Sequence, residues 1–264
     1  MAQPWFIWNG KDSRDMGVIV ETYPPIVYPE ERVEAVAVPG RAGFLTRTEG
    51  PAVYDGYLKT VSIANRRSAD PQAIAAWLRG SGELILGSEP EFVYFGRIIK
   101  EAALDRAMPK GYHGQVAFMV QPFKGRTPPE GDIHWSNGTP APVIYNPGDV
   151  PAAPVVTMSA TLNTEYGPIF LLSVGDAPAS GANTVPYIQI NLQDRPDLSG
   201  CVFDADSRRV TSLDGSEILD SYAVFYRTLN GELFLPARTS SVVALNTTNA
   251  SAASMTIRPR WRWL

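Results

Sequence analysis

Apolar and polar residues alternate along most of the chain, which is the pattern of β-strands with one buried face. In the first half the pattern predicts strands over residues 6–8, 15–21, 31–38, 44–47, 53–64, 83–86, 92–99 and 111–121. In the second half it predicts strands over residues 155–162, 168–175, 187–192, 199–204, 208–213, 232–235, 240–245 and 254–260. The chain is therefore expected to be mainly β.

One segment has helical spacing instead. Asp70 can cap a helix whose first residue is Pro71. Apolar residues then recur at three- and four-residue spacing before two glycines: Ile74, Trp77 and Leu78, then Gly80 and Gly82. The first part of the chain is thus predicted to be an α+β unit, with antiparallel strands and one helix packed against them.

The two halves are separated by a stretch dense in glycine and proline. Residues 124–154 keep no periodic apolar face, and we expect a boundary or linker there, with one short strand at 142–145. The predicted domains are residues 1–130 and residues 131–264. Eight short strands without a helix predict that the second domain is an antiparallel β-sandwich or jelly roll.

Composition narrows the range of partners. The formal charge of −4 on 264 residues offers no basic field for nucleic acid. No apolar run approaches the roughly 20 residues that cross a bilayer, and the N-terminus lacks the features of a signal peptide, so we expect synthesis in a cytoplasm and no membrane partner. Cys201 is the one cysteine, so neither an intrachain disulfide nor a cysteine zinc site is expected.

Candidate catalytic groups are sparse. His113 and His134 belong to no helical metal-binding pattern, and no Gly-x-Ser-x-Gly sequence is present. Asp204, Asp206 and Asp214 could in principle serve a glycosidase, which needs two carboxyl groups, but they fall where hairpin turns are expected. We predict no catalytic residue, no metal and no cofactor.

Several sequence features, taken in their order along the chain, resemble one known family. They are Phe6, Trp8, Asn9 and Gly10; Ser13, Gly17 and Val18; Pro24-Pro25; Glu31-Arg32; residues 38–43 (Val-Pro-Gly-Arg-Ala-Gly); residues 146–155; Val202-Phe203-Asp204; Asp214-Gly215; and residues 260–264. This order is similar to that of the distal tail proteins (Dit) of siphophages, the long-tailed bacteriophages. The resemblance covers nearly the whole chain.

The resemblance implies a structural role in the virion. It implies an N-terminal belt domain that assembles into a hexameric ring at the distal end of the tail tube, and a peripheral galectin-like β-sandwich. The implied partners are further copies of the chain, the tail tube protein and the proteins of the baseplate or adhesion device. The implied location is the phage tail tip.

A ring requires each subunit to meet the next through two different patches, and hairpins at a sheet edge suit that purpose. We therefore predict that a charged strand and its tight turn contribute to the subunit interface: Glu31, Arg32, Pro39, Gly40 and Arg41. The alternative is an ordinary solvated hairpin. Trp5, Phe6 and Trp8 could also meet another subunit, but a place in the core of their own domain is favoured.

Other classes of function stay open. A carbohydrate-binding module or host-cell adhesin would need exposed aromatic rings, and Tyr145, Tyr166, Tyr187 and Tyr222 lie near predicted turns. A glycoside hydrolase accessory enzyme is a weaker alternative. Residues 258–263 alternate arginine with proline or tryptophan, which can indicate nucleic-acid binding, but a sandwich strand with Trp inward and Arg outward is favoured.

Overall fold

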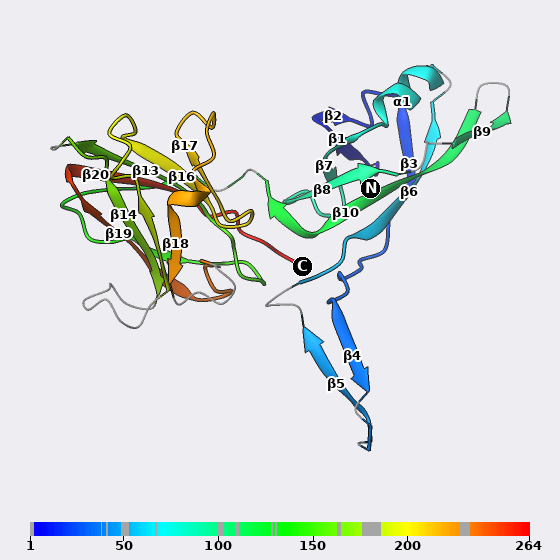
Figure 1. Cartoon of the computed structure of the whole chain (residues 1–264). Coiled ribbons are helices and arrows are strands. Elements are labelled where there is room, and N and C mark those ends of the chain that lie inside the picture. Colours follow the sequence, from blue (N-terminus) through cyan, green and yellow to red (C-terminus); the bar gives the residue numbers. More distant parts are fainter. Residues whose placement is uncertain are drawn as a thin grey trace. The chain divides into compact units, whose positions relative to one another are not determined.

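The computed structural model describes residues 3–37, 39–40, 42–48, 53–66, 68–99, 103–108, 111–127, 129, 131–162, 165–175, 186–226 and 233–264. The chain forms two compact units, Met1–Pro129 together with Trp263–Leu264, and Glu130–Arg262 (Figure 1). As predicted, the protein is mainly β, and α1 is the one α-helix within the described ranges.

An eight-stranded antiparallel sheet forms the body of the first unit. Its strands run in the order β2-β1-β7-β8-β10-β6-β3, and β9 pairs with β10. Their bounds are β1 Phe6–Trp8, β2 Lys11–Asp12, β3 Val18–Thr22, β6 Tyr57–Asn65, β7 Ser81–Leu86, β8 Phe92–Ile98, β9 Ala103–Met108 and β10 Gly111–Arg126. The long strand β10 pairs with β6 on one side and with β9 and β8 in succession on the other, so it joins the whole sheet.

The Asn-Gly pair near the N-terminus makes the turn between β1 and β2. Asn9 and Gly10 both have positive φ, 50° and 75°. This is the backbone of a type I′ hairpin turn, for which Asn-Gly is a preferred sequence. The Oδ1 of Asn9 also accepts a hydrogen bond of 3.0 Å from the backbone nitrogen of Glu83 on β7. The motif therefore makes the turn and ties it to the neighbouring strand.

The predicted helix is confirmed as α1, Pro71–Trp77. Asp70 caps it, because its Oδ1 accepts a hydrogen bond of 2.9 Å from the backbone nitrogen of Gln72. Ile74, Trp77 and the following Leu78 are buried and cover one face of the sheet (Figure 1). The helix thus closes the core of the first unit.

Aromatic rings fill that core. Phe6 stacks on Trp77 with ring centroids 5.4 Å apart, and Phe118 lies 5.2 Å from Trp8. The indole nitrogen of Trp77 donates to the backbone oxygen of Trp8 at 3.1 Å, which satisfies a buried donor. Phe6 and Trp8 are fully buried in their own unit, which confirms the favoured interpretation of these two residues.

A lysine also lies on the core face of β6. Lys59 is only 2% exposed, and its Nζ lies 4.6 Å from the centre of the Tyr94 ring and 5.6 Å from that of Tyr57. Burial lowers the pKa of Lys59, while the charge of Glu89 partly opposes this. Glu89 accepts hydrogen bonds from the Tyr94 hydroxyl and, at 3.3 Å, from Lys124 Nζ. These charged side chains and tyrosine rings together cover one end of the core of the first unit.

The last two residues, Trp263 and Leu264, belong to the first unit, whereas the domain predicted from the sequence to be the sandwich extended to residue 264. Lys124 and Trp263 exchange two backbone hydrogen bonds, of 3.0 and 3.1 Å. The pairing of β10 with β6 ends at Val120. Beyond this point the same edge of β10 has no partner from β6, and at Lys124 it pairs with the C-terminal segment. Trp263 also packs on Phe92, with ring centroids 5.8 Å apart.

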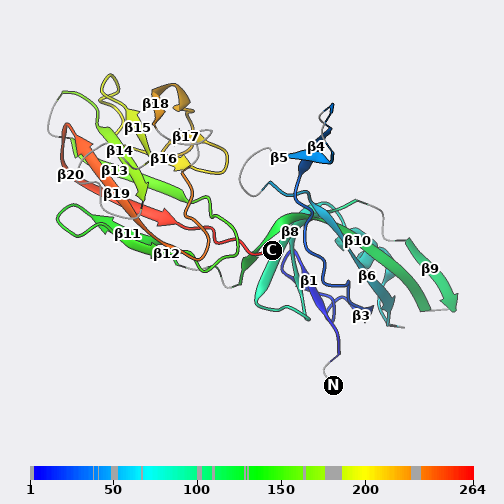
Figure 2. The same ribbon diagram turned by 90° about the horizontal axis from the view of Figure 1, so that it is seen from below.

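The second unit is an antiparallel β-sandwich, as predicted (Figure 2). One sheet, here called the β13 sheet, has the order β11-β20-β13-β16-β17, and the other, the β14 sheet, has the order β12-β19-β14-β15-β18. Their bounds are β11 Ile133–Ser136, β12 Val143–Tyr145, β13 Val155–Leu162, β14 Ile169–Gly175, β15 Tyr187–Asn191, β16 Gly200–Asp204, β17 Arg209–Ser212, β18 Ala223–Tyr226, β19 Ser240–Thr248 and β20 Ala250–Arg258. Phe203 and Phe225 meet between the sheets, with ring centroids 5.9 Å apart.

Some sequence predictions for this region were wrong. The expected linker over 124–154 holds the end of β10 and an unpredicted strand, β11, at the edge of the β13 sheet, where breakers are tolerated. The short strand expected at 142–145 is confirmed as β12, at the edge of the β14 sheet. Of the strand expected at 232–235, residue 232 lies outside the described residues, and among residues 233–235 only Leu235 pairs, in a single bridge with Ala152. Residues 259–262 follow the end of β20 at Arg258 and lie in no strand. The strand β18 was not predicted.

The Asn-Pro-Gly stretch at the entry to the sandwich has a structural explanation. Asn146 is fully buried, and its amide nitrogen donates to the backbone oxygens of Val150 and Leu235, at 3.1 and 2.9 Å. Its Oδ1 accepts from the backbone nitrogen of Gly148 at 2.8 Å. A Cβ at Gly148 would lie 2.3 Å from the backbone oxygen of Arg262, so only glycine fits. The motif joins three separated segments of the second unit.

Candidate assembly surface

The hairpin predicted from the alternating sequence near residue 35 is present. Strands β4 (Val33–Ala37) and β5 (Phe44–Thr48) pair antiparallel over five residues. Within the described residues they form a two-stranded sheet of their own, which stands apart from the eight-stranded sheet in both views (Figures 1 and 2). Every residue of β4 is exposed. An isolated two-stranded hairpin is only marginally stable in water, so this one requires support.

Glu31 and Arg32 lie at the base of the hairpin. Glu31 forms a β-bridge with Tyr54, and the backbone nitrogen of Arg32 donates to the backbone oxygen of Val53 at 2.8 Å. The guanidinium of Arg32 pairs with the carboxylate of Asp55, with Nε 3.1 Å from Oδ1. These contacts fix where the hairpin leaves the first unit. Both side chains remain exposed, so they are also accessible to another molecule.

Pro39 and Gly40 lie at the tip of the hairpin. Both are exposed, and Gly40 has φ of 79°, a conformation that suits glycine. Gly43, with φ of 84°, follows directly before β5. Arg41 lies outside the described residues. The predicted interface residues that the structure describes therefore lie at two ends of the hairpin, with Glu31 and Arg32 at its base and Pro39 and Gly40 at its tip.

The most exposed apolar side chains of this region were not among the predicted residues. Ile26 and Tyr28, which follow the double proline, are 76% and 72% exposed, and Phe44 on β5 is 66% exposed. Val33, Val36 and Leu45 add to this set. Large exposed apolar side chains that gather in one region of a protein are typical of an interaction site. The signal in the sequence was the apolar run Ile26-Val27-Tyr28 between prolines, which no core position explains.

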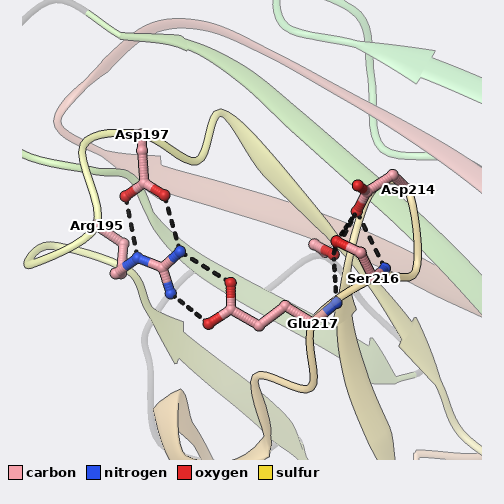
Figure 3. A network of polar contacts seen from close by, with 6 residues as sticks. Arg195, Asp197, Asp214, Ser216 and Glu217 are labelled. Atoms are coloured by element: carbon pink, nitrogen blue, oxygen red, sulfur yellow. Dashed lines mark hydrogen bonds and ion pairs between the residues drawn. The ribbon is translucent and has the colours of Figure 1, made fainter.

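The candidate catalytic carboxylates of the second unit act as turn formers. Asp214 Oδ1 accepts hydrogen bonds from the hydroxyls of Ser212 and Ser216, at 2.5 and 2.8 Å, and from the Ser216 backbone nitrogen (Figure 3). The bond from Ser212, followed by those from Ser216, lowers the pKa of Asp214 to about 2. A general acid at neutral pH needs a raised pKa, so Asp214 is unsuited to that role.

The neighbouring loop is held by an arginine between two carboxylates. Arg195 Nη1 donates to Glu217 at 2.6 Å and Nη2 donates to Asp197 at 2.8 Å (Figure 3). Hydrogen bonds from Arg195 lower the pKa of both Glu217 and Asp197. All three charged side chains are engaged in these ion pairs, which join the loop before β16 to the turn after β17. This arrangement stabilises loops rather than offering a reactive group.

Asp204 and Asp206 are engaged in the same manner. Asp204 accepts from the backbone nitrogen of Asp206 at 3.0 Å and from Arg260 Nη1 at 3.1 Å. Asp206 pairs with Arg262 at 2.5 Å. The two arginines of the C-terminal segment therefore bind acidic turns of the sandwich.

The two histidines belong to different units and have separate partners. His113, on β10, lies 2.9 Å from Glu21, and His134, on β11, lies 3.0 Å from the hydroxyl of Thr256. In the described ranges no three His, Cys, Asp or Glu side chains are grouped so that they could hold a metal ion. None of the helices that the structure describes has the length and apolarity needed to span a bilayer. Cys201 is buried, and burial raises the pKa of its thiol to about 12, which makes it unreactive.

Comparison with known proteins gives matches of structure alone. No protein-family model and no curated protein sequence matches the chain. The SPP1 Dit protein (gp 19.1), a paradigm of the hub adsorption apparatus in Gram-positive infecting phages, matches with a TM-score of 0.62 and 13% identity, over 97% of this chain and 99% of that chain. A chain of the phage P2 baseplate in its activated conformation with Ca matches with a TM-score of 0.40 and 8% identity, over 98% of each chain. The SPP1 match shows that both units together have a Dit-like fold.

Proposed function

We propose that this protein is a structural distal tail protein of a long-tailed phage, located at the tail tip of the virion. In this proposal the first unit is the belt domain and the second unit is the peripheral galectin-like domain. Six copies form a ring that connects the tail tube to the baseplate or adhesion device, and the protein catalyses no reaction. The supporting observation is the match to SPP1 Dit along the full length of both chains.

The β4–β5 hairpin supplies a physical reason for assembly. It projects from the first unit with apolar side chains on both faces, because Val36 and Leu45 are opposite each other on one face and Ala37 and Phe44 on the other. A hairpin gains little from folding alone when its side chains are exposed, as they are at residues 33–37 and 44–46. Docking on the next copy would bury these side chains. Ring closure requires such contacts between different patches of identical subunits.

The net charge and the exposed ion pairs fit a protein partner better than nucleic acid. The chain carries −4 formal charge, and residues 30–48 contain three glutamates and three arginines, so the hairpin sequence has no excess of positive charge. A surface without a positive excess does not attract phosphate backbones. Apolar side chains framed by charged ones are instead the usual composition of a protein interface with a polar rim.

The first experiment measures the oligomeric state of the full chain. We expect light scattering after size exclusion to show a discrete species near six times 28.8 kDa, and negative-stain images to show six-fold rings. Phe44→Ser and Leu45→Ser should abolish this species while leaving a folded monomer. Ile218→Ser, which replaces a similarly exposed side chain in the second unit, should leave the rings intact.

The outcomes separate assembly from misfolding. A chain that is monomeric at all concentrations would contradict the ring, and so would rings that survive both hairpin substitutions. Circular dichroism of each variant checks that the fold is retained. A second experiment tests the location: antibodies against the chain should label purified phage particles at the junction of tail tube and tip, and labelling elsewhere would sink the proposal.

A further inference from the structure

The outward face of the β14 sheet carries no charged residue at any of its described positions. Outward positions are identified by the alternation with buried residues such as Phe170, Leu172 and Ile188. They are Val143 and Tyr145 on β12; Ser240, Val242, Ala244, Asn246 and Thr248 on β19; Ile169, Leu171, Ser173 and Gly175 on β14; Tyr187, Gln189 and Asn191 on β15; and Val224 and Tyr226 on β18. This set is called the neutral face below.

Neutrality is specific to this sheet. The outward face of the β13 sheet carries three charged residues in one row across four strands. Arg258 on β20 is opposite Val155 on β13, which is opposite Asp204 on β16, and Asp204 is opposite Arg209 on β17. The two sheets belong to one unit and are similar in size. The lack of charge on the neutral face is therefore a property of that face and not of the unit.

Apolar groups of the neutral face are exposed at both of its edges. Val143 on β12 is 69% exposed, and Val224 on β18 is 48% exposed. Between the edges, Val242 and Ser173 are buried, so the exposed apolar groups form two separate patches, one at each edge of the sheet. Since the face lacks charged groups, it complements a partner that is itself uncharged.

Two tyrosines form an aromatic platform at the β18 edge. Tyr187 and Tyr226 are opposite each other on β15 and β18, and their rings stack with centroids 4.6 Å apart and an angle of 13° between planes. Tyr187 covers one face of the Tyr226 ring. β18 is the last strand of the sheet, so the second face of that ring is directed away from the sheet, and Tyr226 is 37% exposed.

Amide side chains lie beside this platform. Gln189 follows Tyr187 on the same face of β15 and is opposite Val224, and Asn191 follows Gln189. Asn246 is on the same face across Leu171. An uncharged amide both donates and accepts hydrogen bonds, which matches the hydroxyl groups of a sugar. Aromatic faces next to such groups suit the C–H faces of a sugar ring.

We propose that the β15–β18 edge of the neutral face binds an uncharged polysaccharide. A sugar ring stacks on the open face of Tyr226, and Gln189 binds a neighbouring hydroxyl group. An anionic polymer would need cationic side chains, which this face does not offer at its described positions. The proposal uses the second unit alone, so it is independent of ring assembly.

The experiment begins with the full chain on an array that carries neutral and anionic oligosaccharides side by side. We expect retention on neutral members. Calorimetry with the best neutral member should give the same affinity at about 0.05 and about 0.5 M NaCl, because no ion pair is involved. Tyr226→Ala and Gln189→Ala should each weaken binding by about tenfold or more, whereas Tyr226→Phe should retain most of it.

The matched control is Thr211→Ala, a change on the outward face of the β13 sheet, which should bind like the original chain. Three results would overturn the proposal: no neutral oligosaccharide is bound, binding is anionic and lost with salt, or Tyr226→Ala and Gln189→Ala, confirmed as folded by thermal melting, bind unchanged. Protection of the neutral face from hydrogen exchange on oligomerisation would also overturn it, since the face would then contact protein. We expect Tyr226→Ala to form the same rings as the original chain. Weaker sugar binding by this variant would then not be caused by a loss of assembly.

Discussion

Two antiparallel strand pairs of the first unit share an alternating sequence pattern but differ in their surroundings. β6 and β10 pair over eight residues and bury Val61, Ile63 and Phe118 against the helix α1. β4 and β5 pair over five residues, and β4 buries none of its residues. In both pairs, apolar and polar residues alternate along the strands. Alternation therefore indicates that a face is suited to burial, but it does not say which part of which molecule covers it.

The physical difference lies in what covers each pair. Backbone hydrogen bonds in a hairpin replace bonds to water and contribute little net free energy. The main stabilisation comes from burying apolar area, at about 25 cal/mol per Å². β6 and β10 gain this within their own unit, whereas every residue of β4 is exposed, and the hairpin would gain it by docking on another molecule as proposed.

The largest expected effect is on amide hydrogen exchange. In the monomer, amides in the middle of β6 and β10 should be protected by the global unfolding free energy, on the order of 5–15 kcal/mol, while those of β4 and β5 should have little protection. In the assembled ring the hairpin amides should become protected as well. Mass spectrometry on the two fractions separated by size exclusion measures both. Slow amide exchange in β4 and β5 of the monomer would contradict the expected difference between the two strand pairs.

The next effect is on core stability. Phe118→Ala removes a fully buried ring that contacts Phe6 and Trp8. It should lower the free energy of unfolding by about 3–5 kcal/mol in urea titrations. Met119→Ala is the control on the same strand, because Met119 lies on the opposite face and is 37% exposed; it should cost less than about 1 kcal/mol. Equal losses in the two variants would show that burial does not explain the stability of this pair.

A smaller effect is expected at the helix that covers the core. Asp70→Ala removes the acceptor for the backbone nitrogen of Gln72, which should cost about 1 kcal/mol in the same titration. Asp70→Asn keeps an oxygen at that position and should cost only a few tenths of that amount, roughly 0.3 kcal/mol. If both variants lost the same stability, the charge of Asp70 and not its hydrogen bond would be the stabilising feature.

The smallest effect on the free energy of unfolding is expected in the hairpin. Phe44→Ser in the monomer should change it by less than about 0.5 kcal/mol, because a side chain that is 66% exposed has little burial to lose. Chemical denaturation at low protein concentration measures this value. A loss comparable to that of Phe118→Ala would mean that Phe44 packs within its own chain.

The sequence by itself determined the local features. The cap at Asp70, the Asn9-Gly10 turn, the hairpin around Pro39 and Gly40 and the strands of a sandwich follow from dihedral preference and periodicity over a few residues, and the structure contains each of them. The order of these features was sufficient to indicate the Dit-like fold. Such features depend on neighbouring residues, whose chemistry is written in the sequence.

Only the tertiary structure decided the long-range features. The pairing of Trp263 with Lys124, the edge position of β18 and the placement of Arg32 at the base of the hairpin depend on segments far apart in the chain. The same holds for the exposure of Ile26 and Phe44 and for the neutral face. Burial is a sum over all neighbours in space, and a short stretch of sequence has no information on which distant segments supply them.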